Sequence, residues 1–329
     1  MTSPGTLALA TRGLRKSYGK RLALDGLDLS VPSGVVYGFL GPNGAGKTTT
    51  MRLLTGLLHP DAGSIELLGQ PFTRGDRHRL FDVGALVESP SFYPYLSGRA
   101  NLGVLAAAGA GVPKGRIEEL LELVGLRERA KDKVSGYSLG MKQRLGIAGA
   151  LLSDPKLLLL DEPANGLDPA GIVAMREMLR RLAAMGKTVF VSSHLLAEVR
   201  VLADVVGIIA AGKLVREGPL DSLLGDQGLV RVRVPRADVA AARNVLERLA
   251  RTDAAADDPN EDPWLSVHVE PNRAGAVNRT LAEAGIYASG LESGTDLELL
   301  FLQLTGGSTP SSEGTFGAAG APSDAEGPR

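Results

Sequence analysis

Residues Gly41 to Thr48 have the types and the spacing of a loop that cradles phosphate groups. They match the pattern G-x-x-x-x-G-K-[ST] at every fixed position, after an apolar run and at the start of a helical pattern. Glycines let successive backbone N–H groups turn toward phosphate oxygens, and the helix N-terminus adds partial positive charge. Lys47 would reach the β- and γ-phosphates of a nucleotide, and the Thr48 hydroxyl would ligate Mg²⁺. The alternative, a glycine-rich turn with an incidental lysine, fits this context less well.

Two neighbouring acids, Asp161 and Glu162, follow the apolar run Leu157 to Leu160. Ligands bind at the carboxyl ends of strands in open parallel sheets, so both acids are expected beside the phosphates. Asp161 would hold Mg²⁺, directly or through water, and Glu162 would polarise the attacking water as a general base. Acids after strands are also common loop residues, so this prediction depends on the phosphate loop upstream.

The elements that must position these residues are alternating strands and helices, which predict a parallel sheet. An alternating run over 22–31 predicts a half-buried antiparallel strand. Further strands are predicted over 35–40, 156–160 and 188–192, and helices over 48–58, 117–126, 175–184 and 195–202.

A boundary is expected at residues 220–228, and a small second domain over 229–305. Its predicted elements are strands over 230–234 and 265–269, and helices over 237–250, 274–284 and 297–304. Residues 306–329 consist of Gly, Ser, Pro, Ala and acids, and they contain too few apolar groups to offset the ordering entropy. We therefore expect a disordered tail.

Composition excludes several classes of protein. The 329 residues contain no cysteine, which rules out disulfides, cysteine-ligated metals and thiol catalysis. The formal net charge is -1, so no overall field favours nucleic acid, and no nucleic-acid partner is expected. No run approaches the roughly 20 apolar residues that cross a bilayer. If the protein serves a membrane, a separate chain would span it.

With these motifs in this order, the chain resembles the ATP-binding subunits of ABC transporters over about residues 7 to 220. The resemblance implies an α/β P-loop NTPase core with antiparallel β and helical subdomains, the helical one over about 90–153, besides the small α+β domain. It implies ATP and Mg²⁺ as cofactors, and hydrolysis that powers transport through separate permease subunits at the cytoplasmic face of the membrane. In that family the loop residues that bind ATP would be Gly41, Pro42, Asn43, Gly44, Ala45, Gly46, Lys47, Thr48 and Thr49.

Further site residues follow from the resemblance alone. Tyr18 matches the aromatic that stacks on adenine, and His194 matches the switch histidine near the γ-phosphate, a catalytic role. Ser138 and Gly140 match the signature segment, which contacts ATP held by the other subunit, and Asp168 matches the loop that couples the two sites. Taken singly, Tyr18 could be a turn aromatic, Ser138 a helix cap and His194 a structural histidine.

The sequence departs from the family pattern in two places. Leu139 and Met141 replace two residues of the signature segment, which usually carries two glycines and then glutamine. Glu88 stands where the family usually has glutamine, and a carboxylate only accepts hydrogen bonds and is a harder metal ligand. We expect Glu88 to bind Mg²⁺ or orient water; the alternative is an exposed loop glutamate.

Glu88 and the unusual signature segment narrow the resemblance to exporter ATPases of the bacitracin-resistance, lantibiotic-immunity and daunorubicin-resistance group. A drug, antibiotic or peptide exporter is the function this implies. The aromatic residues Phe92, Tyr93 and Tyr95 are predicted to grip the permease, since aromatics suit an interface centre. The alternative is that they pack the joint between subdomains.

A single copy of each motif implies two chains per working unit, and we expect a homodimer. The competing interpretation is a non-transport ABC ATPase that acts on another macromolecule. A translation-factor type would carry two ATPase cores and a DNA-repair type long coiled coils, and the sequence has neither. A nucleotide kinase would have no use for Ser138 or Asp168.

Overall fold

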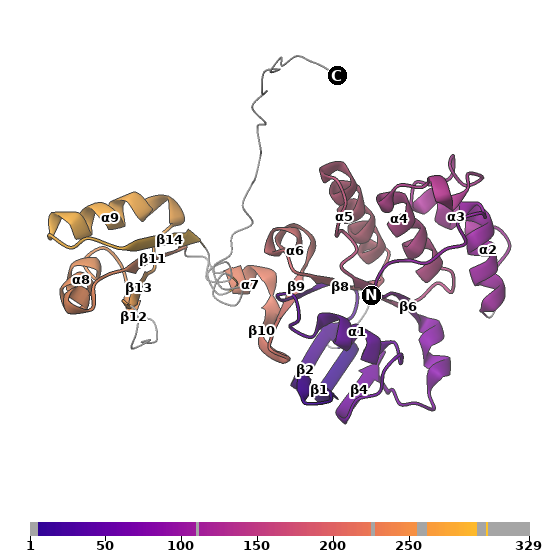
Figure 1. Ribbon diagram of the computed structural model, residues 1–329, viewed down its shortest axis with the longest axis horizontal. Coiled ribbons are helices and arrows are strands. Elements are labelled where there is room, and N and C mark those ends of the chain that lie inside the picture. Colours follow the sequence, from indigo (N-terminus) through magenta and orange to yellow (C-terminus); the bar gives the residue numbers. More distant parts are fainter. Residues whose placement is uncertain (1–5, 110–111, 225–227, 255–261, 295–300, 302–329) are drawn as a thin grey trace, which may run out of the picture.

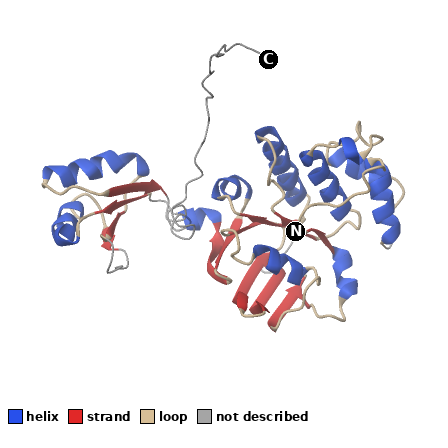
Figure 2. Cartoon of the chain, in the orientation of Figure 1, coloured by secondary structure: helices blue, strands red, loops and turns tan. Residues whose placement is uncertain are grey.

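The structure is a computed structural model that describes residues 6–109, 112–224, 228–254, 262–294 and 301. Its elements are labelled in Figure 1 and coloured by type in Figure 2. The predicted tail over 306–329 lies outside the described residues, as does the predicted helix over 297–304 apart from Phe301.

A six-stranded sheet with the order β10-β9-β3-β8-β7-β6 forms the centre of residues 6–224. All its pairs are parallel except that between β9 and β10. Every residue of β3, β7 and β8 is buried, which explains why these strands consist mainly of apolar residues, apart from Asp161 at the end of β7 and Thr188, Ser192 and Ser193 in β8. The strands are β3 (Val36–Leu40), β6 (Val83–Leu86), β7 (Leu157–Asp161), β8 (Thr188–Ser193), β9 (Val205–Ala210) and β10 (Lys213–Pro219).

Helices cover one face of this sheet. Leu158 and Leu160 of β7 point into a core shared with α2 (Gly98–Ala108), α3 (Arg116–Leu123), α4 (Leu139–Ala150) and α5 (Pro169–Ala184). The short helices α6 (Leu196–Leu202) and α7 (Leu220–Leu224) close a smaller apolar cluster beside β9.

An antiparallel sheet and α1 (Lys47–Leu54) cover the other face, as Figure 1 shows. Leu157 and Leu159 of β7 point into this second core. The strand order is β2-β1-β4-β5, formed by β1 (Leu7–Tyr18), β2 (Arg21–Pro32), β4 (Ala62–Leu67) and β5 (Gln70–Pro71). The antiparallel strand predicted over 22–31 is therefore confirmed.

Residues 229–294 form a separate antiparallel sheet with the order β12-β13-β11-β14. The chain order β-α-β-β-α-β with this pairing is the ferredoxin-like split βαβ arrangement. Val230, Val232, Leu265 and Val267 pack against the helices in an apolar core. The elements are β11 (Leu229–Arg233), α8 (Val239–Leu246), β12 (Thr252–Ala254), β13 (Trp264–Val267), α9 (Ala274–Glu283) and β14 (Gly290–Gly294).

Several predicted bounds were wrong. Helix α1 ends at Leu54 instead of residue 58, because Gly56 adopts a φ of 68° that stops the helix. Helix α5 begins at Pro169, six residues before the predicted start, because Asp168 caps it and proline suits a first turn. Helix α8 is shorter than the predicted 237–250, since residues 236–238 form a 3₁₀ turn.

The 3₁₀ helices of the described residues are η1 (Arg77–Asp82), η2 (Val134–Gly136), η3 (Arg236–Asp238, the turn before α8) and η4 (Pro271–Arg273). Within the described part of the chain, no helix combines the length and the apolar character needed to cross a bilayer.

Candidate nucleotide-binding site

The loop between β3 and α1 has a backbone that requires glycine. A Cβ atom at position 41 would lie 2.4 Å from the carbonyl oxygen of Ile209. Gly44 and Gly46 have φ angles of 80° and 115°, which other residues rarely adopt. Gly46 also precedes the first residue of α1 and has no side chain to cap the helix, so the first-turn N–H groups are available to an anion.

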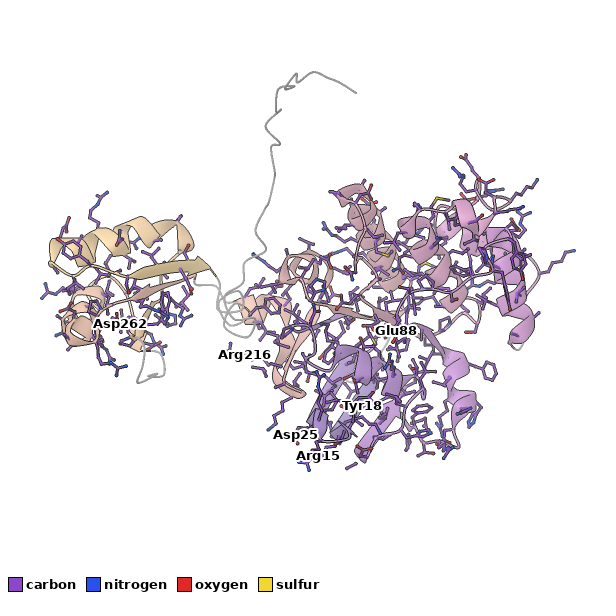
Figure 3. The ribbon with its side chains drawn as sticks, in the orientation of Figure 1. Arg15, Tyr18, Asp25, Glu88, Arg216 and Asp262 are labelled. Carbon is purple, nitrogen blue, oxygen red and sulfur yellow. The ribbon has the colours of Figure 1, made fainter. Side chains whose placement is uncertain are left out.

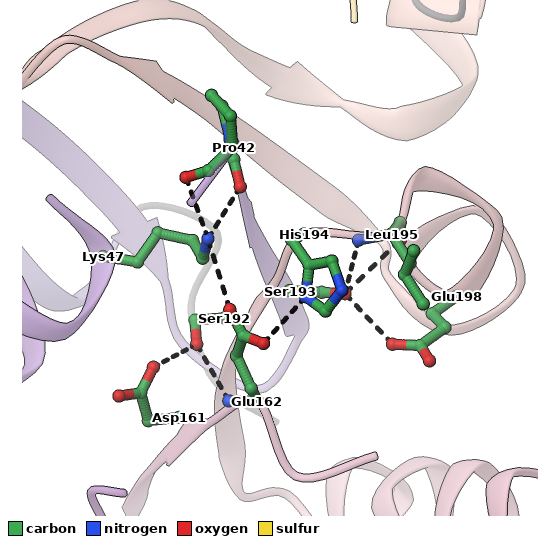
Figure 4. Close-up of polar contacts among 10 residues, drawn as sticks. Pro42, Lys47, Asp161, Glu162, Ser192, Ser193, His194, Leu195 and Glu198 are labelled. Carbon is green, nitrogen blue, oxygen red and sulfur yellow. Dashed lines mark hydrogen bonds and ion pairs between the residues drawn. The ribbon is translucent and has the colours of Figure 1, made fainter. Parts of the chain in front are cut away.

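Lys47 lies folded back over this loop, as Figure 4 shows. Its ammonium group donates to the carbonyl oxygens of Gly41 at 2.7 Å and Pro42 at 3.2 Å. The same nitrogen lies 3.3 Å from Oε1 of Glu162, and the side chain is only 5% exposed. The positive charge is therefore already fixed across the mouth of the loop.

Both acids at the end of β7 are held by Ser192 of β8. The Ser192 hydroxyl donates to Oδ1 of Asp161 at 2.5 Å and accepts from the backbone N–H of Glu162 at 2.9 Å. Glu162 has a φ of 45°, an uncommon conformation that clusters at functional sites. Our sequence reasoning assigned Ser192 only to a buried strand; its polarity within the run Thr188 to Ser193 was the available signal.

His194 completes a polar chain with Lys47 and Glu162. Its Nδ1 lies 2.7 Å from Oε2 of Glu162. The turn that carries the histidine is fixed by Ser193, whose hydroxyl donates to Oε2 of Glu198 at 3.0 Å and accepts from the N–H of Leu195 at 3.0 Å. The structure thus brings together the predicted Lys47, Glu162 and His194, and adds Glu198, which no sequence motif marks and which bonds to Ser193.

A cavity of about 300 Å³ opens beside these residues. Tyr18 lies at its edge, partly exposed, in the region labelled in Figure 3. Arg21, another residue that our sequence reasoning missed, adds a positive charge to the lining. The cavity is lined by Tyr18, Arg21, Ala23, Asn43, Gly44, Gly46, Lys47, Thr48, Thr49 and Glu162.

Ser138, Gly140 and Asp168 lie in a different groove, of about 500 Å³. The Ser138 hydroxyl accepts from the N–H of Met141 at 3.2 Å, which confirms that it caps α4. Asp168 caps α5 in the same way, by accepting from the N–H of Gly171 at 2.9 Å. Two of the predicted functional positions therefore belong to helix N-termini that open into a groove of their own.

Glu88 faces helix α1. Its carboxylate forms an ion pair with the Arg52 guanidinium, and both side chains are partly exposed. The hydrogen bond to Glu88 is the main reason that the pKa of Arg52 is raised, and the Tyr18 side chain contributes less. Glu88, labelled in Figure 3, does not line the 300 Å³ cavity.

Comparisons with known proteins agree with this geometry. Residues 24–165 match the protein-family model described as ABC transporter. The chain is 41% identical over 303 residues to the bacitracin transport ATP-binding protein BcrA of Bacillus licheniformis, which covers 92% of this chain and 98% of that protein. It is 45% identical over 213 residues to the lantibiotic transport ATP-binding protein SrtF of Streptococcus pyogenes, covering 65% of this chain and 91% of that protein.

Solved structures share the fold. A dimeric ATP-binding cassette in a post-hydrolysis state with ADP and Pi superposes with a TM-score of 0.59 at 25% identity, over 65% of this chain and 99% of that chain. An ATP-binding subunit of an ABC transporter gives a TM-score of 0.59 at 30% identity, over 66% of this chain and 92% of that chain. This chain is a member of the ABC transporter family, in which it is an ATP-binding subunit that hydrolyses ATP.

Proposed function

We propose that the chain powers the export of an antibiotic or peptide, as a homodimer bound to separate permease subunits at the cytoplasmic face of the membrane. The observation that carries this proposal is the division of site residues. Lys47, Glu162 and His194 form one connected group, whereas Ser138 and Asp168 lie in a separate groove of the same chain. The exporter role is supported by relatives named for bacitracin and lantibiotic transport.

The contacts of Lys47 suggest how nucleotide binding starts the reaction. Glu162 is the anion that lies beside Lys47. The phosphates of ATP would take over that role, because their charge is greater and they also receive the N–H groups at the start of α1. Glu162 is then free to accept a proton, while His194 still holds its second oxygen.

The Glu162 carboxylate, once it no longer pairs with Lys47, can assist hydrolysis. A water molecule attacks the γ-phosphorus, the bond to the β–γ bridging oxygen breaks, and Glu162 takes the water proton. Lys47 offsets the charge that develops on the phosphate oxygens. The products are ADP and phosphate.

The oxygens of Thr48 and Asp161 fit Mg²⁺, which prefers hard oxygen ligands and binds through one or two carboxylates and substrate phosphates. Among the described residues, no group of three or more His, Cys, Asp or Glu could hold a metal by itself. When bound, Mg²⁺ neutralises charge on the transferred phosphoryl group.

The second groove would complete the site of the other subunit. Ser138 and Gly140 would present the start of α4 to the γ-phosphate of ATP bound by the partner, since a helix N-terminus attracts anions. Asp168, at the start of α5 in the same groove, would sense that contact. ATP bound between the two subunits would then hold the dimer together, and hydrolysis would allow the subunits to separate.

The permease would cover the exposed pair Tyr93 and Tyr95, whose rings lie 5.8 Å apart. They are 50% and 65% exposed, whereas Phe92 packs against the core and serves the subdomain joint. Asn101, which is buried, accepts from the Tyr93 N–H at 2.8 Å and donates to its carbonyl oxygen at 3.1 Å, which fixes the segment. A neighbouring groove of about 420 Å³ would add apolar contact; its lining includes Phe81, Leu86, Pro90, Phe92 and Leu105.

The test is purification of the tagged full chain from its native membrane in mild detergent, followed by reconstitution into vesicles. We expect a membrane-spanning partner to co-purify and the vesicles to move labelled bacitracin or a lantibiotic only with ATP. Tyr93→Ser with Tyr95→Ser should lose the partner, whereas Tyr287→Ser, at a tyrosine of the second domain that is 75% exposed, should keep it. A chain that purifies without any membrane-spanning partner would contradict the proposal.

A further inference from the structure

A groove of about 450 Å³ lies beside the 420 Å³ groove proposed for the permease, and η1 contributes to both. Arg77, at the start of η1, lines the larger groove, whereas Leu80 and Phe81, near its end, line the permease groove. The other walls of the larger groove come from the end of α1, the segment 58–60 and β4. We call it the arginine groove, after Arg74 and Arg77 in its lining. Its position puts it next to the proposed permease surface.

The floor of the arginine groove is apolar and well packed. Leu53 and Ile65 are buried members of the core below the antiparallel sheet, and Leu58 and Phe72 pack against that core. The end of α1 approaches the Phe72 ring closely, since a Cβ atom at Gly56 would lie 3.1 Å from it. An apolar part of a ligand can therefore bind on this floor without rearrangement of the chain.

The charge of the arginine groove is positive. Arg74 and Arg77 are exposed, and within the described part of the chain their side chains form no ion pair and no hydrogen bond. The acid of the same turn, Asp76, is already engaged, because its carboxylate accepts from the Thr73 hydroxyl at 2.6 Å and pairs with Arg79 at 3.6 Å. Among the described residues that line the groove, none is Asp or Glu. The two guanidinium groups are therefore available to an anionic ligand.

Two large apolar side chains are exposed next to these arginines. Leu57, which is 67% exposed, precedes Leu58 of the groove floor, and Phe81, which is 55% exposed, lies in η1. Cations beside exposed leucine and aromatic side chains are typical of a surface that rests on an anionic membrane, since the cations attract head-group phosphates and the apolar groups enter the interface. A free phosphate ion would use only the arginines. The apolar floor and Leu57 therefore favour a lipid.

We propose that the arginine groove binds an anionic phospholipid of the membrane: Arg74 and Arg77 pair with its phosphate, and part of an acyl chain lies on the apolar floor. The proposal goes beyond the export function above and rests on it only in placing the chain beside a membrane. The lipid would hold the subunit against the bilayer next to the permease. This contact is independent of the nucleotide, because the groove and the 300 Å³ cavity have no lining residue in common.

The test is co-flotation of the purified full-length chain with vesicles, without permease and without nucleotide. One set of vesicles contains phosphatidylcholine alone, and the other an equal mixture of phosphatidylcholine and phosphatidylglycerol. We expect binding to the anionic vesicles only, and weaker binding as salt is added. Arg74→Gln with Arg77→Gln should raise the lipid concentration for half-maximal binding about 10- to 30-fold, the effect of two cations at an anionic surface. Leu57→Ser should raise it about fivefold, through lost apolar contact.

The matched control is Arg248→Gln with Arg279→Gln, which removes the same charge from two exposed arginines of the second domain. It should bind anionic vesicles as the wild type does. Equal weakening in the control would show that only net charge matters, and would overturn the proposal. Release of the bound protein by inorganic phosphate at constant ionic strength would also overturn it, because the groove would then bind the free ion.

The same proteins separate this proposal from the export function. If the export proposal fails, no membrane-spanning partner co-purifies, whereas binding to anionic vesicles remains. If the wild type binds neither kind of vesicle, or both equally, the lipid proposal is wrong. Loss of the co-purified partner in the Arg74→Gln, Arg77→Gln variant, together with no vesicle binding by the wild type, would assign the groove to a protein partner instead.

Discussion

The phosphate loop and the groove lined by Ser138, Gly140 and Asp168, here called the signature groove, both lie at helix N-termini. They differ in the hydrogen-bond and ion-pair partners of their polar groups. At the phosphate loop, α1 follows an uncapped glycine, and Lys47, Glu162 and His194 are bonded to one another. At the signature groove, side-chain caps already satisfy the starts of α4 and α5. The first region is a connected group around Lys47 within one chain, whereas the lining of the second groove includes Arg144 and Asp168 but no lysine.

This difference indicates which residues can bind phosphate within one chain and which can only add to a site formed by other residues. A connected group can bind phosphate and move a proton without help, whereas a capped helix start only adds a few donors to a ligand that something else holds. In the proposed dimer, the same chain would therefore carry two unequal halves of one site. Substitutions in the first half should therefore lower ATP turnover or ATP affinity far more than those in the second.

The largest loss of turnover is expected for Glu162→Gln, about 10²–10⁴-fold, because the amide cannot accept the water proton. ATP affinity should stay close to that of the wild type. Steady-state ATPase rates and equilibrium nucleotide binding measure both quantities. Glu217→Gln is the control, since that carboxylate accepts bonds from Tyr37 and Ser30 away from the site. Near-normal turnover in Glu162→Gln would show that Glu162 is not the general base.

Lys47→Ala should weaken ATP binding roughly 10- to 100-fold, the cost of one or two lost charge-assisted hydrogen bonds. Titration calorimetry gives the affinity. Lys187→Ala is the matched control, because Lys187 is also buried and donates to a backbone carbonyl, that of Pro155, at 2.8 Å. Equal affinities in the two variants would show that the effect comes from folding and not from phosphate binding.

Ser138→Ala separates a role in catalysis from a role in helix capping when it is compared with Ser97→Ala. Both serines cap a helix, and each loss should lower the free energy of unfolding by about 1 kcal/mol in urea titrations. In reconstituted transporter, only Ser138→Ala should also slow ATP turnover, about tenfold, since in the proposed dimer it alone would face a phosphate. Equal turnover in the two variants would reduce Ser138 to a structural cap.

The smallest effect is expected for Asp154→Asn, a change outside both regions that should affect only the free energy of unfolding. The hydrogen bond of Asp154 to Lys187 is the main reason that the pKa of this carboxyl lies below its usual value; burial opposes this effect, and the charges of Lys187 and Arg116 lower the pKa further by smaller amounts. A lowered pKa stabilises the fold at neutral pH, and that contribution is lost as the pH falls below about 4 through the folded-state pKa. Asp154→Asn should therefore cost about 0.5–1 kcal/mol at pH 7, and the difference from the wild type should vanish in acid.

Asparagine is the suitable replacement because Asp154 has a φ of 54°, which asparagine tolerates. Urea denaturation at pH 7 and at pH 3 makes the measurement. A difference that persists in acid would show that the charge is not its cause.

The features that the sequence predicted are local ones. The phosphate loop needs only its glycines and lysine, and the two acids need only a buried strand before them, so spacing along the chain was sufficient. Helix ends were less predictable, because Gly56 and Asp168 decide them through a single backbone angle or a single cap.

The contacts that sequence reasoning missed join residues far apart in the chain. Ser192 reaches Asp161 across neighbouring strands, and Arg52 reaches Glu88 across 36 positions. Neither pair has a spacing that marks it. In the domain over 229–294 the strands β11 and β13 were predicted, but β12, β14 and the order of the sheet were not, since the antiparallel order depends on pairings that alternation alone does not reveal.

The central claim is that two copies of this chain enclose the nucleotide, and the most direct test is the mass of Glu162→Gln in solution by analytical ultracentrifugation. With ATP and Mg²⁺ the account predicts a dimer at micromolar concentrations, and with ADP, or with Lys47→Ala added, a monomer. A strictly monomeric Glu162→Gln protein that binds ATP, both at high concentration and together with its permease, would contradict it.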